Sequence, residues 1–97
     1  MSREIRWSSR AIIEWVEILE YWKERNKSTA YGDKLDHLLQ ASFAIISQWP
    51  EIGKSTDVPL VRIKILRDYL IYYRIESGFI DILAIWDSRR NPQKFKL

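Results

Sequence analysis

The chain has 97 residues, 46% of them apolar and none of them cysteine, which excludes a disulfide framework and a thiolate metal site. This length is typical of one domain, and we expect residues 1–97 to fold as a single unit. The N-terminal sequence MSREIRW holds no apolar run, and no segment approaches the ~20 apolar residues of a membrane span. We therefore expect a cytoplasmic protein without a signal peptide or a membrane anchor.

Positive charge is concentrated in the second half of the chain. The net charge is +3, with 7 basic and 8 acidic residues in positions 1–53 against 9 and 5 in positions 54–97. A basic half with a pI near 9.3 favours an anionic partner such as nucleic acid. No glycine-rich phosphate loop, nucleophile elbow or metal-ligand cluster is present, so we expect neither a cofactor nor a metal.

A short strand and a helix are predicted at the start of the chain. Alternating charged and apolar residues predict a strand over Arg3–Trp7, and Ser8 or Ser9 is placed to cap the helix that follows. Spacings of three and four residues predict one broad apolar stripe on this helix, with the acidic residues on its solvated side. The stripe consists of Ala11, Ile12, Trp15, Val16, Ile18, Leu19 and Trp22.

A second helix is predicted from a cap at Ser28 to about Trp49, where Pro50 stops it. The short link predicts that the two helices form an antiparallel hairpin. Its stripe consists of Tyr31, Leu35, Leu38, Leu39, Ser42, Ile45, Ile46 and Trp49. Residues 50–57 are predicted to be a loop in which Gly53 is free to take a positive φ. The single histidine, His37, lies mid-helix without a second ligand at a useful spacing.

Three strands are predicted in the last third of the chain, over Val58–Leu66, Tyr69–Ile75 and Phe79–Trp86. The last two are apolar on both faces, whereas two helices can cover only one face of a sheet. Monomers avoid a bare apolar face, so we expect a partner to cover it. The predicted fold class is α+β, with an N-terminal strand, an antiparallel two-helix hairpin and a curved three-stranded antiparallel sheet.

Basic residues mark the predicted working surface. Arg62 and Lys64 share one strand face, which Arg74 on the next strand could reach, depending on the register. Arg89 and Arg90 project from the end of the last strand, where Pro92 stops strand pairing.

Cations of this kind, close to aromatic rings, can grip phosphates or stabilise a phosphoryl transition state. Arg89 and Arg90 could instead pair with Asp87 or with the acids of the helices. The candidates for proton transfer are Tyr72, Asp87 and Lys64.

Taken in order, these segments resemble the RelE/ParE superfamily of bacterial toxins from type II toxin–antitoxin modules, which includes plasmid stabilisation proteins. The resemblance spans nearly the whole chain. It is carried by Trp7-Ser8 with Ala11, Ser28, Pro50 with Gly53, Val61-Arg62, Tyr69–Ile75, Ile80–Ile85 and Asp87–Pro92.

The resemblance implies a toxin held inactive by a small cognate antitoxin. RelE-like members cut messenger RNA in the ribosome without a metal, and ParE-like members poison DNA gyrase. Arg62, Lys64 and Arg89 match the RelE-like basic set, but Leu70 stands where that set has an arginine and Phe95 where a tyrosine is often found. These two departures favour a ParE-like toxin. An RNA endonuclease and a non-toxic binding module of the same fold are the alternatives.

The resemblance and the apolar sheet together give two sets of candidate site residues. The candidates for catalysis or target contact are Arg62, Lys64, Arg89 and Arg90. The candidates for partner binding are Leu70, Tyr72, Arg74, Leu83 and Trp86. A disordered antitoxin segment would add as a strand or as a helix in a groove, and could build a larger oligomer with the toxin.

Overall fold

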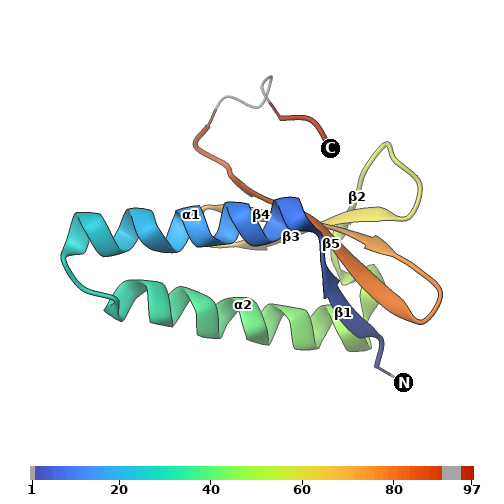
Figure 1. Cartoon of the computed structure of the whole chain (residues 1–97). Coiled ribbons are helices and arrows are strands. Elements are labelled where there is room, and N and C mark those ends of the chain that lie inside the picture. The colour runs from blue at the N-terminus through green and yellow to red at the C-terminus, as the bar shows by residue number, and fades with distance from the viewer. Residues whose placement is uncertain (1, 91–94) are drawn as a thin grey trace.

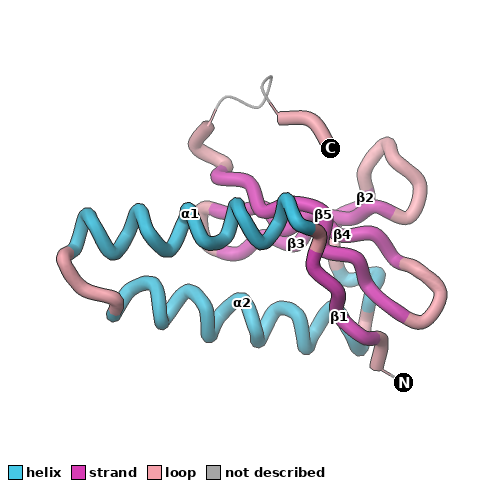
Figure 2. The backbone as a smooth tube through the Cα atoms, in the orientation of Figure 1, coloured by secondary structure: helices cyan, strands magenta, loops and turns pink. Residues whose placement is uncertain are grey.

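The computed structural model describes residues 2–90 and 95–97 (Figure 1). The elements are β1 (Glu4–Trp7), α1 (Ser9–Asn26), α2 (Ala30–Gln48), a 3-10 turn η1 (Pro50–Ile52), β2 (Lys54–Ser55), β3 (Val61–Leu66), β4 (Tyr69–Ile75) and β5 (Phe79–Asp87). The two helices run antiparallel along the sheet (Figures 1 and 2). No helix within the described residues is long and apolar enough to cross a membrane. Asn91 and Pro92, which carry part of the family resemblance, lie outside the described residues.

The strands form one mixed sheet in the order β1-β5-β4-β3-β2. β1 pairs with β5 in parallel, and the other pairs are antiparallel. The predicted α+β class is confirmed, and the predicted three-stranded sheet gains a strand at each edge. The strand predicted from Val58 begins only at Val61, because Leu60 has a φ of 67° and the left-handed backbone interrupts the extended chain.

The core lies between the helices and one face of the sheet, which we call the inner face. Tyr69, Ile71 and Tyr73 alternate along β4 and are buried there, with the side chains of both helices packed over them. The core residues from the helices are Ala11, Trp15, Leu35, Leu39, Phe43 and Ile46. Trp7 of β1 packs edge-on against Phe43 of α2.

The predicted apolar stripes are too wide. Ile12 and Val16 of α1 are 49% and 51% exposed, and Trp49 at the end of α2 is 62% exposed. α1 buries only Ala11 and Trp15, because it lies along the β5 side of the sheet and presents a narrow band to it. Helical spacing identifies an apolar stripe, but the width that is buried depends on what the helix packs against.

Tyr73 ties the sheet to the chain that follows α2. Its side chain is fully buried, and its hydroxyl donates to the Pro50 carbonyl at 2.6 Å and accepts from the Gly53 amide at 2.9 Å. Gly53 does not use the positive φ that a glycine permits, since its φ is −72°. Glycine is needed there for space, because a Cβ would lie 2.5 Å from the Tyr73 hydroxyl and 2.8 Å from the Ile63 carbonyl oxygen.

Replacing Tyr73 with Phe should lower the free energy of unfolding by about 1–3 kcal/mol, because the Gly53 amide and the Pro50 carbonyl lose their buried partner. Urea unfolding followed by circular dichroism measures this change. An unchanged urea midpoint would show that the two hydrogen bonds contribute nothing to stability.

Gly53→Ala should also destabilise the protein, through the clash with the Tyr73 hydroxyl. The same substitution should cost less in the Tyr73→Phe background, because the nearest of the three clashing atoms, the Tyr73 hydroxyl oxygen, is gone. A double-mutant cycle with additive free energies would contradict this steric account.

Candidate functional site

Strand β5 has a strand neighbour on one side along only half of its length. β1 pairs with Phe79–Ile82 and then ends, so the rest of that edge borders α1. The Ser8 amide donates to the Ile82 carbonyl at 2.9 Å, and the Ser8 hydroxyl donates to the Leu83 carbonyl at 2.9 Å. Further along, the Ile85 amide donates to a Glu14 carboxylate oxygen at 2.9 Å. Side chains of the α1 segment thus replace the missing strand.

A β-bulge marks the point where the parallel pairing ends. Tyr72 pairs with Ala84 and Tyr73 with Ile82, so Leu83 is the extra residue on β5. A bulge bends its strand and increases the local twist. Leu83 therefore lies at the bend of the sheet.

Four of the five predicted partner-binding residues, Leu70, Tyr72, Arg74 and Trp86, lie on the face of the sheet that points away from the helices, which we call the outer face. Leu70, Tyr72 and Arg74 alternate onto it along β4 and are partly buried. Residues paired across strands share a face. One apolar row across this face consists of Ile65, Leu70 and Trp86. Its member on β3, Ile65, is 64% exposed.

The chain's own tail covers part of the outer face. The Phe95 ring stacks on Tyr72 with centroids 4.3 Å apart and meets Trp86 at 5.0 Å. Phe95 therefore shields these rings within the chain, and the part of the outer face left for a partner is smaller than the sequence indicates. Burial raises the pKa of the Tyr72 hydroxyl above its ordinary value.

Arg62 and Lys64 lie on the inner side of β3, where they pair with Tyr73 and Ile71. The Arg62 guanidinium donates to the carbonyls of Glu51 and Gly53 at 3.1 and 2.7 Å, so it holds the chain around η1. Arg74 pairs with Val61 and lies on the opposite face, so the suggestion that Arg74 could reach the Arg62 face is wrong. A register, which decides this, cannot be read from the alternation within one strand.

The four candidate cations do not form one site. Arg62 aligns with Ile82 across β4, whereas Arg89 follows Asp87, which aligns with Leu66. Strand spacing and rise put the two arginines two strands, ~10 Å, apart across the sheet and at least ~13 Å apart along it.

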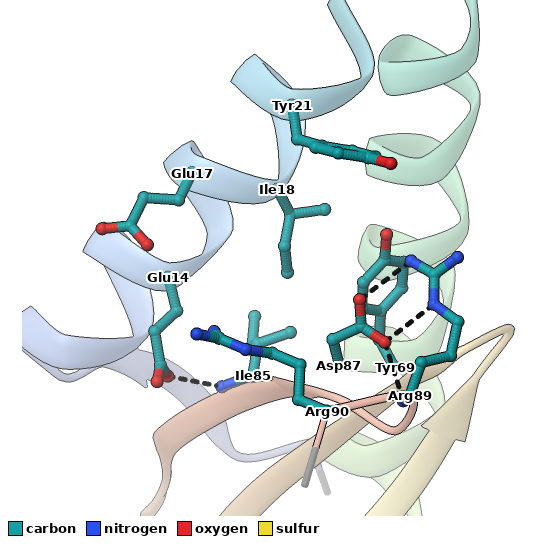
Figure 3. A pocket seen from close by; sticks show the side chains of 9 residues that line it. All are labelled: Glu14, Glu17, Ile18, Tyr21, Tyr69, Ile85, Asp87, Arg89 and Arg90. Atoms are coloured by element: carbon teal, nitrogen blue, oxygen red, sulfur yellow. Dashed lines mark hydrogen bonds and ion pairs between the residues drawn. The ribbon is translucent and has the colours of Figure 1, made fainter. Parts of the chain in front are cut away.

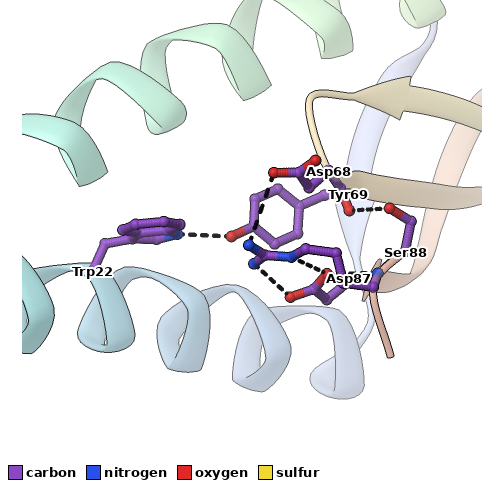
Figure 4. Close-up of polar contacts among 6 residues, drawn as sticks. Trp22, Asp68, Tyr69, Asp87 and Ser88 are labelled. Carbon is purple, nitrogen blue, oxygen red and sulfur yellow. Dashed lines mark hydrogen bonds and ion pairs between the residues drawn. The ribbon is translucent and has the colours of Figure 1, made fainter. Parts of the chain in front are cut away.

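Arg89 forms an ion pair with Asp87, which the sequence indicates as the alternative to contact with a target. Its guanidinium contacts both carboxylate oxygens of Asp87, at 3.0 and 2.8 Å, and lies 4.0 Å from Asp68. The Arg89 hydrogen bond is the largest cause that holds the pKa of Asp87 below its usual range. Beside it, Trp22 donates its indole N–H to the Tyr69 hydroxyl at 2.7 Å, and Ser88 donates to the Asp68 carbonyl (Figure 4).

Arg90 makes no ion pair with the described residues. Its guanidinium lies over the Trp86 ring, 5.0 Å from the centroid. It also borders a cleft of about 430 Å³ between α1 and the end of β5, toward which Glu14, Glu17 and Tyr21 project (Figure 3). The cleft is lined by Glu14, Glu17, Ile18, Tyr21, Tyr69, Ile85, Asp87, Arg89 and Arg90. Arg90 is thus an exposed cation beside an aromatic ring, a pairing that suits an anionic or polar partner.

Two of the three candidates for proton transfer, Tyr72 and Asp87, have shifted pKa values. General acid–base catalysis needs a group with a pKa near the working pH. The pKa of Tyr72 is raised by burial, and that of Asp87 is lowered by Arg89, so both shifts lead away from neutrality. Among the described residues, no group of three or more His, Cys, Asp or Glu side chains is placed to hold a metal ion.

Sequence reasoning missed two residues that support this surface. Glu14 was assigned to the solvated side of its helix, but it accepts from the β5 backbone. Arg10 bonds Glu14 at 3.1 Å, donates to the Lys96 carbonyl and lies over the Phe95 ring. The spacing of four between Arg10 and Glu14 permits an ion pair, but nothing in the sequence points to the tail.

The Asp87–Arg89 pair should make stability depend on pH in the acid range. A carboxyl whose folded pKa is lowered contributes stability above its unfolded pKa of about 4, and loses it as the pH falls through the folded value. Asp87→Asn and Arg89→Gln should both flatten the dependence of the urea midpoint on pH below about pH 4. An acid slope that neither substitution changes would show that this pair does not contribute.

Comparisons with known proteins identify the family. The family described as "ParE toxin of type II toxin-antitoxin system, parDE" matches residues 5–92. A solved structure titled "Chromosomal ParDE TA system from P. aeruginosa" superposes with a TM-score of 0.73 at 18% identity, covering 87% of this chain and 94% of that one. This likeness shows that the two chains share a fold. A search of curated protein sequences found no match. The chain belongs to the ParE toxins of type II toxin–antitoxin systems, within the RelE/ParE superfamily.

Proposed function

We propose that this chain arrests growth in the cytoplasm by poisoning DNA gyrase, and that a cognate antitoxin encoded beside it neutralises it. The family match supports a ParE-type toxin. The observation that carries the choice of target is this family match over residues 5–92, together with Leu70 and Phe95 at the two positions where RelE-like toxins have an arginine and a tyrosine.

The two departures from the RelE-like pattern support the same choice. Leu70 lies in the apolar row of the outer face, and Phe95 packs on Tyr72 and Trp86. Both positions therefore serve apolar contacts. Neither side chain can grip a phosphate or move a proton, as the arginine and tyrosine of RelE-like toxins would.

We assign the target contact to Arg90 and a positioning role to Arg89. Arg89 is committed to Asp87, and this pair fixes the turn that follows β5. Arg90 is exposed and has no carboxylate partner among the described residues, so its charge can be offered to a target. Arg62 holds the backbone around η1, which favours a structural role for it.

The antitoxin is proposed to dock on the outer face. Ile65, Leu70 and Trp86 form an apolar row there, and the row ends at an exposed residue on β3. β2 pairs only with Arg62 and Ile63, so β3 has no described strand partner on its other side from Lys64 to Leu66. An extended segment could add at this edge and lay its apolar side chains on the row.

Induced expression in a bacterium tests the target. We expect growth arrest, DNA breaks that depend on gyrase, intact messages in primer extension, and recovery when the neighbouring antitoxin gene is co-expressed. Codon-positioned cuts in translated messages with unbroken DNA would favour the endonuclease instead. Normal growth would favour a non-toxic binding module.

A DNA-cleavage assay with purified gyrase and purified toxin variants tests the role assigned to Arg90. Arg90→Ala should reduce DNA cleavage by purified gyrase by about tenfold, the value of one charge-assisted hydrogen bond. Lys34→Ala, an exposed lysine on α2, is the matched control and should behave as the wild type. Unchanged cleavage by a folded Arg90→Ala protein would remove Arg90 from the target contact.

A further inference from the structure

The packing of Phe95 defines a small binding site on the outer face. The ring stacks almost parallel on Tyr72, at 21° between planes, and meets the edge of Trp86 at 66°. The Arg10 guanidinium lies over the ring, 5.0 Å from its centroid, and donates to the backbone carbonyl of Lys96. We call Tyr72, Trp86 and Arg10 the aromatic socket.

The components of the socket are held in place from outside the tail. Arg10 is oriented by its ion pair with Glu14, which in turn accepts from the Ile85 amide of β5. Tyr72 and Trp86 lie on adjacent paired strands. The rings and the cation are therefore positioned by β4, β5 and α1, so we expect the site to keep its shape when Phe95 leaves it.

The residues on either side of Phe95 in the sequence have the same charge as the arginines that border the socket. Arg10 contacts the occupant, and Arg90 lies over Trp86. In sequence, Phe95 is flanked by Lys94 and Lys96, so the residue that fills this site belongs to a basic segment, although the site itself is bordered by two arginines. Like charges repel, whereas acidic residues beside an aromatic ring would attract both guanidinium groups.

We propose that the aromatic socket is a peptide-binding site that Phe95 fills in the unbound chain, and that an acidic partner segment displaces Phe95 by inserting an aromatic side chain of its own. The ring of the incoming residue would stack on Tyr72, and a carboxylate beside it would take the place of the Lys96 carbonyl at Arg10. That the partner is the antitoxin rests on the proposed function. The existence of the socket and its preference for an acidic segment with an aromatic residue are independent of the proposed function.

The test uses the full-length Phe95→Ala protein and three acetylated, amidated peptides: EEFEE, EEAEE and KKFKK. Removing Phe95 vacates the socket, so Phe95→Ala should bind EEFEE about tenfold more tightly than the wild type, whose tethered tail competes. The Trp86 indole N–H resonance should shift on binding. Leu97→Ala, a 52% exposed tail residue, is the matched control and should bind as the wild type does.

Peptide chemistry then decides the specificity. Phe95→Ala should bind EEAEE about threefold to tenfold more weakly than EEFEE, because an aromatic stack is lost. It should bind KKFKK more weakly than EEFEE, and the difference should shrink in high salt. Equal binding of EEFEE and EEAEE, or of EEFEE to Phe95→Ala and the wild type, would overturn the proposal, and KKFKK binding as tightly as EEFEE would overturn the acidic preference.

A second variant at position 95 covers the case in which the first does not fold. If Phe95→Ala does not fold, Phe95→Leu keeps the apolar bulk without the ring and should still bind EEFEE more tightly than the wild type. The peptides contain no antitoxin sequence and the assay needs no toxicity. A chain that binds EEFEE but breaks no DNA would refute the proposed target alone, and a toxic chain that ignores EEFEE would refute the socket alone.

Discussion

The hydrogen bond from the Ile85 amide to the Glu14 carboxylate gives a partner to the half of β5 that β1 does not pair with. β1 covers only the first half of β5, and a bare strand edge leaves backbone groups without partners. Ser8 and Glu14 supply those partners from the start of α1. The position of α1 along β5 follows from this requirement.

Several features of the surface depend on that placement. Because Glu14 lies at the edge of β5, its ion-pair partner Arg10 is brought over the outer face, where it contacts Phe95. The same helix carries Trp22, whose indole donates to Tyr69 on the inner face. One helix therefore closes the core and borders the surface offered to partners. The two faces of the sheet therefore have different roles. The inner face packs against the helices and stabilises the fold, whereas the outer face leaves apolar and aromatic side chains partly exposed to solvent.

Two adjacent arginines at the end of β5 have different roles because only one has an acidic partner. Asp87 engages Arg89 through two carboxylate oxygens and also accepts from its backbone amide. A bidentate pair of this kind fixes geometry more than it adds stability at an exposed site. The Arg90 guanidinium lies above the Trp86 ring and has no carboxylate partner among the described residues, so its charge is available to a binding partner.

The two helices and the longer strands could be predicted from the sequence, because periodicity and caps are local signals. The two-residue strand β2 could not, because it lies in the segment 50–57 that is predicted to be a loop. The Ser8 cap and the burial of Tyr69, Ile71 and Tyr73 follow from such signals. What could not be predicted depends on how separate segments meet. The face on which Arg74 lies is set by the β3–β4 register, and the need for Gly53 is set by a hydroxyl twenty residues away.

The candidate site divides in the same way. The place of Leu70, Tyr72 and Trp86 on a second face of the sheet could be predicted, because a strand that is apolar on both faces implies a second surface. Arg62 and Lys64 could not be separated from Arg89 and Arg90 without the sheet order, and the roles of Glu14 and Phe95 rest on contacts that no spacing marks. Basic residues near the end of a strand indicate where a functional surface lies. The role of each residue depends on which group its side chain contacts in the fold.

The central claim is that the outer face is the surface an antitoxin binds, and calorimetry with the purified cognate antitoxin tests it most directly. Leu70→Asp places a charge in the middle of the apolar row and should weaken binding by at least about tenfold, or ~1.4 kcal/mol. Trp49→Asp, at an exposed position beyond the end of α2, should leave the affinity near that of the wild type. If a folded Leu70→Asp protein binds the antitoxin as tightly as the wild type does, the outer face is not the docking surface.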